Sequence, residues 1–453
     1  MIMKGKVKRI LLITSKKTER LEGYLFSKLK VRGYSFDLLE VRDIYYLSQR
    51  DLMDRIKPFI NSYDIIILPG NIAGNFSKFS KKVVKGTEAP FYLHEYLRYK
   101  KPEELSQELP AEKAFPDVTK LIASKALKEA SSNYKYAYKI RELKIPYKPP
   151  PLLVFSEIFP KDSLEALNKA RYFLRSGADA LVVSYNPNLD FSELRNALKT
   201  LRQETRKPIG LDAPIHVMRE LYDYVDILLS FDMLSVKQNA KWIKNKASVV
   251  LLDDINKADE LIKVARANEL KIIVDPVTYP SIYPGVLQTF LRARKISRRY
   301  KVPIMLGLLN ITELADVDSS GLNGFATFLA AEAGISIILI GEESVKSRGS
   351  VYEARIASDM SSVSLKLGKP PKDIGLDLLA VKEKNWAHDN IVRGNGETLW
   401  IKVNGEDIEV NCRQECPLDV FERIEGLSAK EVFSISIMIY RYCSPWSKDW
   451  KCL

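Results

Sequence analysis

Short apolar runs separated by amphipathic segments of helical length dominate the middle of the chain. From Leu152 onward they read LLVF, ALVVS, IGLD, VDILLS, SVVLL, KIIVD, PIMLG and SIILI. Eight strands that alternate with helices within about 220 residues is the layout of a (β/α)8 barrel. Uniformly apolar strands fit this layout because helices cover the outer face of a barrel sheet and packed side chains fill its interior. The pattern therefore predicts a barrel over residues 148–368.

The first part of the chain, residues 1–147, alternates strand and helix on a smaller scale. Strands are predicted at KRILLITS, YSFDLLEV and YDIIILPG, with helices at TERLEGYLFSKLKVRG and LMDRIKPFINS. This order is typical of a three-layer α/β domain of the flavodoxin or Rossmann kind. After the third strand, NIAGNFSKFSKKVVKG reads either as a ligand-binding loop or as a turn into a basic helix. A charged helical extension follows, and the prolines of IPYKPPP form a stiff linker.

The last part, residues 369–453, is predicted to be a small α+β domain with a docking or dimerisation role. IGLDLLAVKEK and ETLWIKVNGEDIEVNC read as strands, the latter as a hairpin around Asn404 and Gly405, and LSAKEVFSISIMIYRYC reads as an amphipathic helix. The cysteines lie here, and their spacings match no standard zinc or iron–sulfur pattern. A metal site, buried thiols and a disulfide are the alternatives for Cys412, Cys416, Cys443 and Cys452.

Composition and charge exclude several classes of partner. With 46% hydrophobic and 28% charged residues the chain is typical of a soluble protein. No apolar run approaches the roughly 20 residues of a membrane span, and the N-terminus lacks a small-residue cleavage site, so we expect a cytoplasmic protein. The net charge of +13 is spread among acidic residues without a nucleic-acid-binding motif, so we expect no nucleic-acid or membrane partner. The Lys-, Glu- and Ile-rich composition suits a thermophile.

Polar side chains follow the strands of the predicted barrel, at the end where this fold builds its active sites. Any one of them can be a helix N-cap, and for Asp232, Asp253 and Asp254 an N-cap explains the residue as well as a binding role does. Together they predict an acidic mouth, which favours a ligand rich in N–H donors over an anion. The residues are Glu157, Ser184, Tyr185, Asn186, Asp212, Ser230, Asp232, Asp253, Asp254, Asp275, Asn310, Glu342 and Glu343.

Two basic residues after the eighth predicted strand offer a place for an anionic second substrate. Lys346 and Arg348 lie near a helix start, where phosphate binding is physically natural. The alternative is that both are ordinary surface charges. The chain has three histidines, which argues against a histidine-rich metal site, and we assign no metal ligands.

Three strand ends resemble those of the pterin-binding barrels, the superfamily that joins dihydropteroate synthase to the folate-dependent and corrinoid-dependent methyltransferases. They are RKPIGLDAP, KIIVDPVTYP and PIMLGLLNIT, at the third, sixth and seventh strands. The three-part arrangement also resembles the archaeal dihydropteroate synthase-related proteins. The resemblance implies a reduced pterin as substrate or cofactor, with Asp275 on its amino-pyrimidine edge and Asp212 reaching the ring. A carboxylate suits that edge because it can accept two adjacent N–H groups. We assign the rest of the pterin site to Asn310, Ser230, Asp232 and Asn186.

The sequence also departs from the synthase pattern. Synthases have a glycine-rich turn after the sixth-strand Asp-Pro, where this chain has Val277, Thr278 and Tyr279. They carry Ser-Arg-Lys at the seventh strand, where this chain ends in Asn310, and an arginine and a histidine at the eighth strand, where Leu339 and Gly341 stand. GLLNIT is more similar to the Gly-Leu-Ser-Asn of the methyltransferases. In that branch Asn310 would polarise the reactive pterin nitrogen, and Glu157 would occupy the place of the first-strand glutamate.

These observations lead to one hypothesis with two alternatives. The family-level prediction is a pterin-binding transferase of folate or tetrahydromethanopterin metabolism, in which a pterin condenses with an arylamine as in dihydropteroate synthase. The first alternative is methyl transfer between a reduced pterin and a corrinoid or other acceptor, and the second is a non-catalytic pterin-binding protein. Asn310 and Glu157 are the candidate catalytic residues, and we expect a homodimer.

Overall fold

A computed structural model of the chain describes residues 7–16, 33–379, 393–395, 398–403, 406–415 and 417–421, together with isolated positions between residues 23 and 29 and after residue 421. The chain divides into two compact units, Met1–Asp377 and Leu378–Leu453. The first unit contains the predicted α/β domain and the predicted barrel. The predicted second boundary, at residue 368, lies slightly upstream of the boundary between the units.

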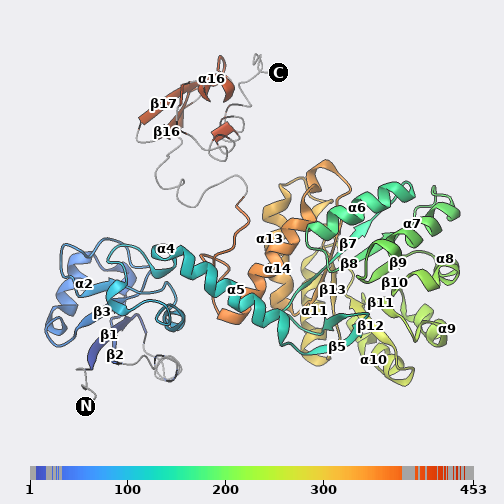
Figure 1. Ribbon diagram of the computed structural model, residues 1–453, viewed down its shortest axis with the longest axis horizontal. Helices are drawn as coiled ribbons and strands as arrows, with labels where there is room; N and C mark the ends of the chain where they lie inside the picture. The colour runs from blue at the N-terminus through green and yellow to red at the C-terminus, as the bar shows by residue number, and fades with distance from the viewer. Residues whose placement is uncertain are drawn as a thin grey trace. The chain divides into compact units, whose positions relative to one another are not determined.

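Eight parallel strands form the barrel (Figure 1). Their order in the sheet is β12-β11-β10-β9-β8-β7-β14-β13, and an isolated parallel bridge between Val274 and Ile304 joins the two ends. Each strand coincides with one of the apolar runs of the sequence, so the predicted barrel is confirmed. The strands are β7 (Leu153–Ile158), β8 (Ala180–Ser184), β9 (Ile209–Asp212), β10 (Ile227–Phe231), β11 (Ala247–Leu251), β12 (Lys271–Asp275), β13 (Met305–Gly307) and β14 (Ile337–Ile340).

The side chains of the barrel strands alternate between two apolar clusters. One cluster fills the interior and includes Leu153, Phe155, Val182, Leu229, Val249, Ile273, Met305 and Leu339. The other packs under the surrounding helices and includes Val154, Leu181, Val183, Leu211, Leu228, Val250, Val274 and Ile338. Because successive side chains of a strand point to opposite faces, the alternation also fixes which residue at each strand end points inward.

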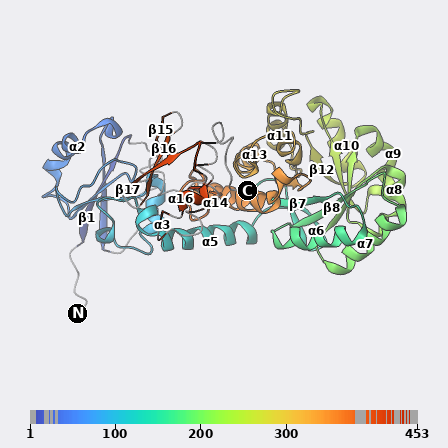
Figure 2. The same cartoon turned by 90° about the horizontal axis from the view of Figure 1, so that it is seen from above.

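Helices surround the strands, and α13 and α14 lie side by side in both views (Figures 1 and 2). Several helices begin at an acidic N-cap that accepts a backbone N–H, as Asp162 does for α6 and Asp190 for α7. The helices are α6 (Ser163–Arg175), α7 (Phe191–Glu204), α8 (Ile215–Glu220), α9 (Met233–Ile243), α10 (Ala258–Ala267), α11 (Leu287–Arg299), α12 (Leu309–Thr312), α13 (Ser319–Ala333) and α14 (Ser350–Leu367).

A β-hairpin closes the N-terminal end of the barrel. Its strands are β5 (Tyr136–Ile140) and β6 (Leu143–Pro146), and its Ile140 and Ile145 are buried in the cluster that fills the barrel interior. The hydroxyl of Tyr138 donates a 2.8 Å hydrogen bond to the carbonyl oxygen of Ile272, near the start of β12. The hairpin precedes the predicted boundary at residue 147 but packs against the barrel.

The N-terminal sheet is parallel, with strand order β2-β1-β3-β4. Its three predicted strands are confirmed as β1 (Lys8–Thr14), β2 (Tyr34–Glu40) and β3 (Ile65–Leu68). The prediction of a basic helix before Lys85 was wrong. VVK forms the edge strand β4 (Val83–Lys85), whose valines are buried against the other strands. The helix predicted after β1 falls largely outside the described residues. The helices that follow are α2 (Gln49–Ile56), α3 (Leu93–Tyr96), α4 (Ala111–Ala114) and α5 (Pro116–Ser132).

The second unit contains the predicted hairpin, formed by β16 (Thr398–Val403) and β17 (Glu406–Asn411), with β15 (Arg393–Asn395) beside β16 and a short helix α16 (Pro417–Phe421). Cys412 and Cys443 form a disulfide, which decides between the alternatives for this pair. Cys416, Cys452, the turn at residues 404–405 and most of the predicted helix fall outside the described residues. Residues 374–379, predicted as part of a strand, have no regular secondary structure. None of the helices in the described part of the chain combines the length and apolarity that a membrane crossing requires.

Candidate functional site

Four polar side chains point inward at the C-terminal end of the barrel. Each follows an interior residue of its own strand by two positions: Glu157 on β7, Ser184 on β8, Asp212 on β9 and Asp275 on β12. The period of two along a strand therefore places them together above the packed interior. The structure thus brings these four predicted residues together at one end of the barrel, and their role in binding stays a prediction.

Glu157 is buried, with 7% of the residue exposed. The hydroxyl of Ser184, on the neighbouring strand, donates a 2.5 Å hydrogen bond to Oε1 of Glu157. Burial raises the pKa of Glu157 to about 7, against the hydrogen bond from Ser184, and the charges of Asp212 and Glu343 act in the same direction as burial. Near neutral pH this carboxyl can therefore hold or release a proton, which suits a general acid or base.

A β-bulge brings Ser230 to Asp212. Along β10, Leu229 points into the barrel, so strict alternation would direct Phe231 inward as well. The register with β11 shifts between Leu228 and Phe231, and Phe231 instead packs in the outer cluster. Ser230 takes up the shift with a φ of +65°, and its hydroxyl donates a 2.9 Å hydrogen bond to Oδ2 of Asp212. Bulges are frequent beside active sites because they redirect a side chain.

Asp275 is held by the loop that follows it. The backbone N–H of Val277 donates a 2.7 Å hydrogen bond to Oδ1 of Asp275. Val277 has a φ of +60°, a strained conformation for a β-branched residue. Burial raises the pKa of Asp275 to about 7, the charge of Asp212 raises it further, and the hydrogen bond from Val277 and the charge of Arg292 oppose these effects. Burial also raises the pKa of Asp212.

Asn310 is connected to the same loop through Thr278. Its Nδ2 donates a 3.1 Å hydrogen bond to the carbonyl oxygen of Thr278, and Oγ1 of Thr278 accepts a 3.1 Å hydrogen bond from the backbone N–H of Gly307. The loop after β12 is thereby joined to the end of β13. Sequence reasoning missed Thr278, which stands only as a departure from the synthase pattern, and no local sequence signal marks its contacts.

Two strand ends of the mouth carry no side chain. Gly307 follows the interior residue Met305 by two positions, and Gly341 follows Leu339 by two. A Cβ at position 341 would lie 3.2 Å from the carbonyl oxygen of Glu157, closer than nearly all such contacts. Glycine at position 341 therefore allows the end of β14 to pack closely against the backbone of β7, and a Cβ at position 307 would contact Thr278 and Asn310.

The other predicted site residues have local contacts of their own or are exposed. Asp232 is the N-cap of α9 and accepts a hydrogen bond from the backbone N–H of Ser235. Oδ1 of Asn186 accepts a hydrogen bond from the backbone N–H of Asn188. Lys346 donates to the carbonyl oxygens of Glu313 and Ala315 and pairs with Asp316, so it fastens the loop after α12. Arg348 is exposed. Their roles in binding stay predictions.

Arg292 anchors the loop after β12 from helix α11. Its Nε donates to the carbonyl oxygen of Pro276 at 2.9 Å and its Nη2 donates to that of Val277 at 3.0 Å. The guanidinium thus holds the loop that holds Asp275. Within the part of the chain that the structure describes, no group of three or more His, Cys, Asp or Glu side chains is arranged to bind a metal ion.

Comparisons with known proteins bear on the fold. No protein-family model matches the chain. An uncharacterized protein of Methanocaldococcus jannaschii is 26% identical over 434 residues, which cover 84% of this chain and 80% of that protein. Among solved structures, dihydropteroate synthase of Yersinia pestis with a pterine–sulfa conjugate covers 50% of this chain and 98% of its own, at 13% identity and a TM-score of 0.41.

A second similar structure is dihydropteroate synthase of Coxiella burnetii in complex with pteroic acid. It covers 47% of this chain and 92% of its own chain, with 16% identity and a TM-score of 0.38. At such identities a likeness concerns the fold alone. The structural neighbours are dihydropteroate synthases and other barrel enzymes, and by its own strand order the chain has a (β/α)8 barrel.

Proposed function

We propose that this chain is a pterin-binding transferase of reduced-pterin metabolism. The observation that carries the proposal is the pair Asp212 and Asp275, which point inward from β9 and β12 at the mouth of the barrel. The 2-amino and N3–H groups of a pterin are adjacent donors, and a carboxylate can accept both. Asp275 is assigned to this edge and Asp212 to the ring.

The surroundings of the two acids suit a flat heterocycle with several N–H groups. Ser230 directs a hydroxyl to Asp212, and no side chain extends from the strand ends at Gly307 and Gly341. Burial raises the pKa of both acids, and that of Asp275 to about 7, so Asp275 can change protonation near neutral pH. An anion would face Glu157, Asp212 and Asp275 together, which disfavours it by charge repulsion.

Glu157 and Asn310 are assigned the chemical roles. Glu157, with a pKa raised to about 7 by burial, has the proton affinity that general acid–base catalysis needs near neutral pH. Asn310 follows the end of β13, and its amide is a donor that can be redirected from the carbonyl of Thr278 to a ring nitrogen. In the synthase-like reaction an arylamine would displace an activated group from the pterin.

One observation favours the methyl-transfer alternative. A pyrophosphate leaving group needs cations, and Gly307, Asn310 and Gly341 at the ends of β13 and β14 supply none. The basic residues that follow β14 are Lys346, which is engaged by the loop after α12, and the exposed Arg348. Lys169, on α6, pairs with the carboxylates of Glu165 and Glu343. A methyl group moving from the pterin to a corrinoid or other acceptor needs no such cation. A non-catalytic pterin-binding protein would need only the acids.

Calorimetric titration with reduced pterins tests the proposal. The unsubstituted protein should bind a reduced pterin saturably, and Asp275→Asn should weaken binding about 10- to 100-fold because the paired acceptor is lost. Asp223→Asn, an exposed acid before β10, is the matched control and should bind normally. If the unsubstituted protein does not bind a reduced pterin, the synthase-like, methyl-transfer and binding-protein hypotheses are all rejected.

Two turnover assays then distinguish the reactions. In the first, a pterin pyrophosphate is incubated with an aminobenzoate-type amine and the adduct is measured. In the second, a methylated reduced pterin is incubated with a reduced corrinoid and the loss of the methyl group is measured. Adduct formation supports the synthase-like reaction, methyl loss supports the alternative, and pterin binding without either product supports a binding protein.

A further inference from the structure

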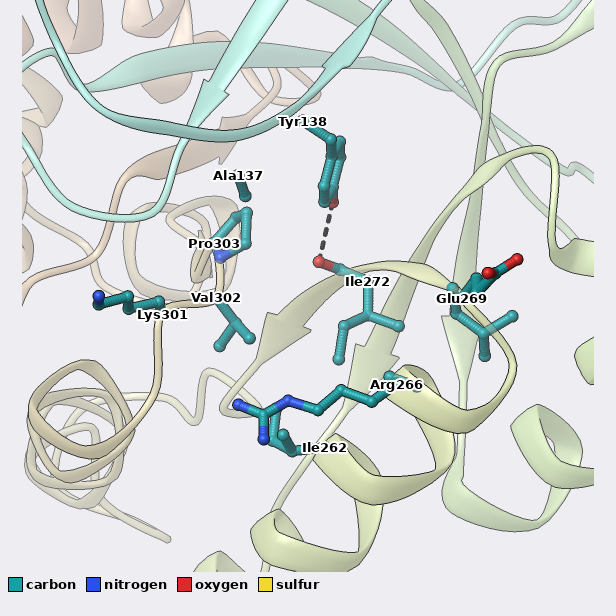
Figure 3. Close-up of a pocket in the computed structure, with 11 residues that line it drawn as sticks. Ala137, Tyr138, Ile262, Arg266, Glu269, Ile272, Lys301, Val302 and Pro303 are labelled. Atoms are coloured by element: carbon teal, nitrogen blue, oxygen red, sulfur yellow. Dashed lines mark hydrogen bonds between the residues drawn. The ribbon is translucent and has the colours of Figure 1, made fainter.

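A cavity of about 370 Å³ lies at the N-terminal end of the barrel, opposite the acidic mouth. Its walls come from three places: the hairpin strand β5, the C-terminal part of α10 with the start of β12, and the segment that leads into β13 (Figure 3). The volume falls in the range of small-molecule sites, which is roughly 300–1,000 Å³. We propose that this cavity is a second ligand site, for a small aromatic carboxylate.

Apolar side chains form part of the cavity wall, beside charged side chains. Ile262 of α10 lies on one side, and Val302 and Pro303, which precede β13, lie on the other. Ala265 of α10 also lines the cavity. An aromatic or alicyclic ring that enters would exchange water for these side chains, which is favourable in proportion to the apolar area covered. A purely polar ligand would gain nothing from them.

Arg266 and Lys301 are the cations that line the cavity, and in Figure 3 the side chain of Lys301 extends to the left, away from Arg266. In Figure 3 the side chain of Arg266 extends beneath Val302, and within the described part of the chain it pairs with no carboxylate. The acid on the rim is already paired, because Glu269 contacts Lys244 at 2.6 Å, and its carboxylate points away from Arg266 in Figure 3. A guanidinium that has no carboxylate partner can donate two parallel hydrogen bonds to the carboxylate of a ligand, because its N–H groups are planar and suitably spaced. The apolar side chains beside it would contact the ring of the same ligand.

The cavity also lies at the seam of the barrel with the least strand pairing. Strands β12 and β13 are joined by the isolated bridge between Val274 and Ile304, whereas the other neighbouring strands pair over two to five residues. Near the start of this seam the carbonyl of Ile272 is satisfied by the hydroxyl of Tyr138, not by β13 (Figure 3). A ligand that spans α10 and the segment before β13 would hold the two sides of the seam together and stabilise the folded barrel.

Titration of the full chain with benzoate tests the proposal, with the uncharged benzamide as a matched probe. We expect saturable binding of benzoate and a rise in melting temperature, with benzamide at least about tenfold weaker because it lacks the charge that Arg266 would meet. Arg266→Gln should weaken benzoate about tenfold or more, whereas Lys263→Gln, an exposed position of the same helix outside the cavity, should leave it unchanged.

A variant that fills the cavity tests whether benzoate binds there and not elsewhere on the protein. Ala137 is exposed and lines the cavity from β5, so Ala137→Trp should close it without disturbing the interior and should abolish benzoate binding. Asp275→Asn, at the opposite end of the barrel, should leave benzoate binding intact. The proposal is overturned if benzoate does not bind saturably, if Arg266→Gln and Ala137→Trp bind it normally, or if Asp275→Asn abolishes binding.

Discussion

The hydroxyl of Ser230 donates a 2.9 Å hydrogen bond to Asp212 from a backbone with a φ of +65°. A non-glycine residue in the left-handed region costs on the order of 1 kcal/mol, so the bulge stores strain at the site. Val277, which donates its N–H to Asp275, has the same feature with a φ of +60°. Both inward aspartates of the proposed pterin site are thus held by strained residues.

Paired substitutions at position 230 separate strain from hydrogen bonding. Ser230→Gly relieves the backbone and Ser230→Ala does not, so the glycine variant should be more stable than the alanine variant by about 1 kcal/mol in urea unfolding. Both variants lose the hydroxyl, and both should bind a reduced pterin equally more weakly than the unsubstituted protein. Equal stabilities would show that the bulge carries no strain, and unchanged binding would show that the hydroxyl does not orient Asp212.

Binding of a reduced pterin should depend on pH through Asp275. Burial raises the pKa of this carboxyl to about 7, so it is mostly protonated at pH 6 and mostly ionised at pH 8. The ionised form accepts the paired N–H groups, so affinity should rise from pH 6 to pH 8. Asp275→Asn should remove most of this rise. Calorimetric titrations at several pH values and constant ionic strength measure this rise. An affinity that falls from pH 6 to pH 8 would contradict the role of ionised Asp275 in binding the pterin.

Glu157 should make the folded protein less stable as the pH rises. Its pKa is raised by burial to about 7, whereas an unfolded glutamate titrates near 4.3. The folded state therefore binds the extra proton between these values, so its contribution to stability is complete below about pH 4 and is lost as the pH rises through 7. Asp275 acts in the same direction.

Substitution at Glu157 tests this linkage. Glu157→Gln keeps a neutral side chain, so it should remove roughly half of the fall in melting temperature between pH 5 and pH 8. The exposed Glu332→Gln is the control and should leave the pH profile unchanged. A steeper fall in Glu157→Gln than in the unsubstituted protein would exclude the raised pKa.

Tyr138 should contribute to barrel stability through its hydroxyl. Tyr138→Phe would leave the carbonyl oxygen of Ile272 without its recorded hydrogen bond, which should lower the free energy of unfolding by about 1–2 kcal/mol. Tyr136→Phe, at an exposed position of the same strand, is the matched control and should change stability little. Equal effects of the two substitutions in urea unfolding would indicate that the hydroxyl of Tyr138 is not needed.

Most of the barrel could be predicted from the sequence because its strands are short apolar runs that alternate with segments of helical length. Once one interior residue of a strand is known, the alternation of side chains also tells which other residues of that strand point into the barrel. Glu157, Asp212 and Asp275 are placed in this way. The edge strand β4 was missed because three residues beside a run of lysines carry too little periodic signal. The basic context indicated a helix.

The sequence by itself determined the barrel, the acidic character of its mouth and the candidates Asp212, Asp275 and Asn310. Tertiary structure decided which acids meet, because strands distant in the chain come together only when the barrel closes. It also decided the bulge at Ser230, the contact of Thr278 with Asn310 and the hairpin beneath the barrel. A positive φ at serine or valine has no local sequence signal, since it is imposed by register and packing around the residue.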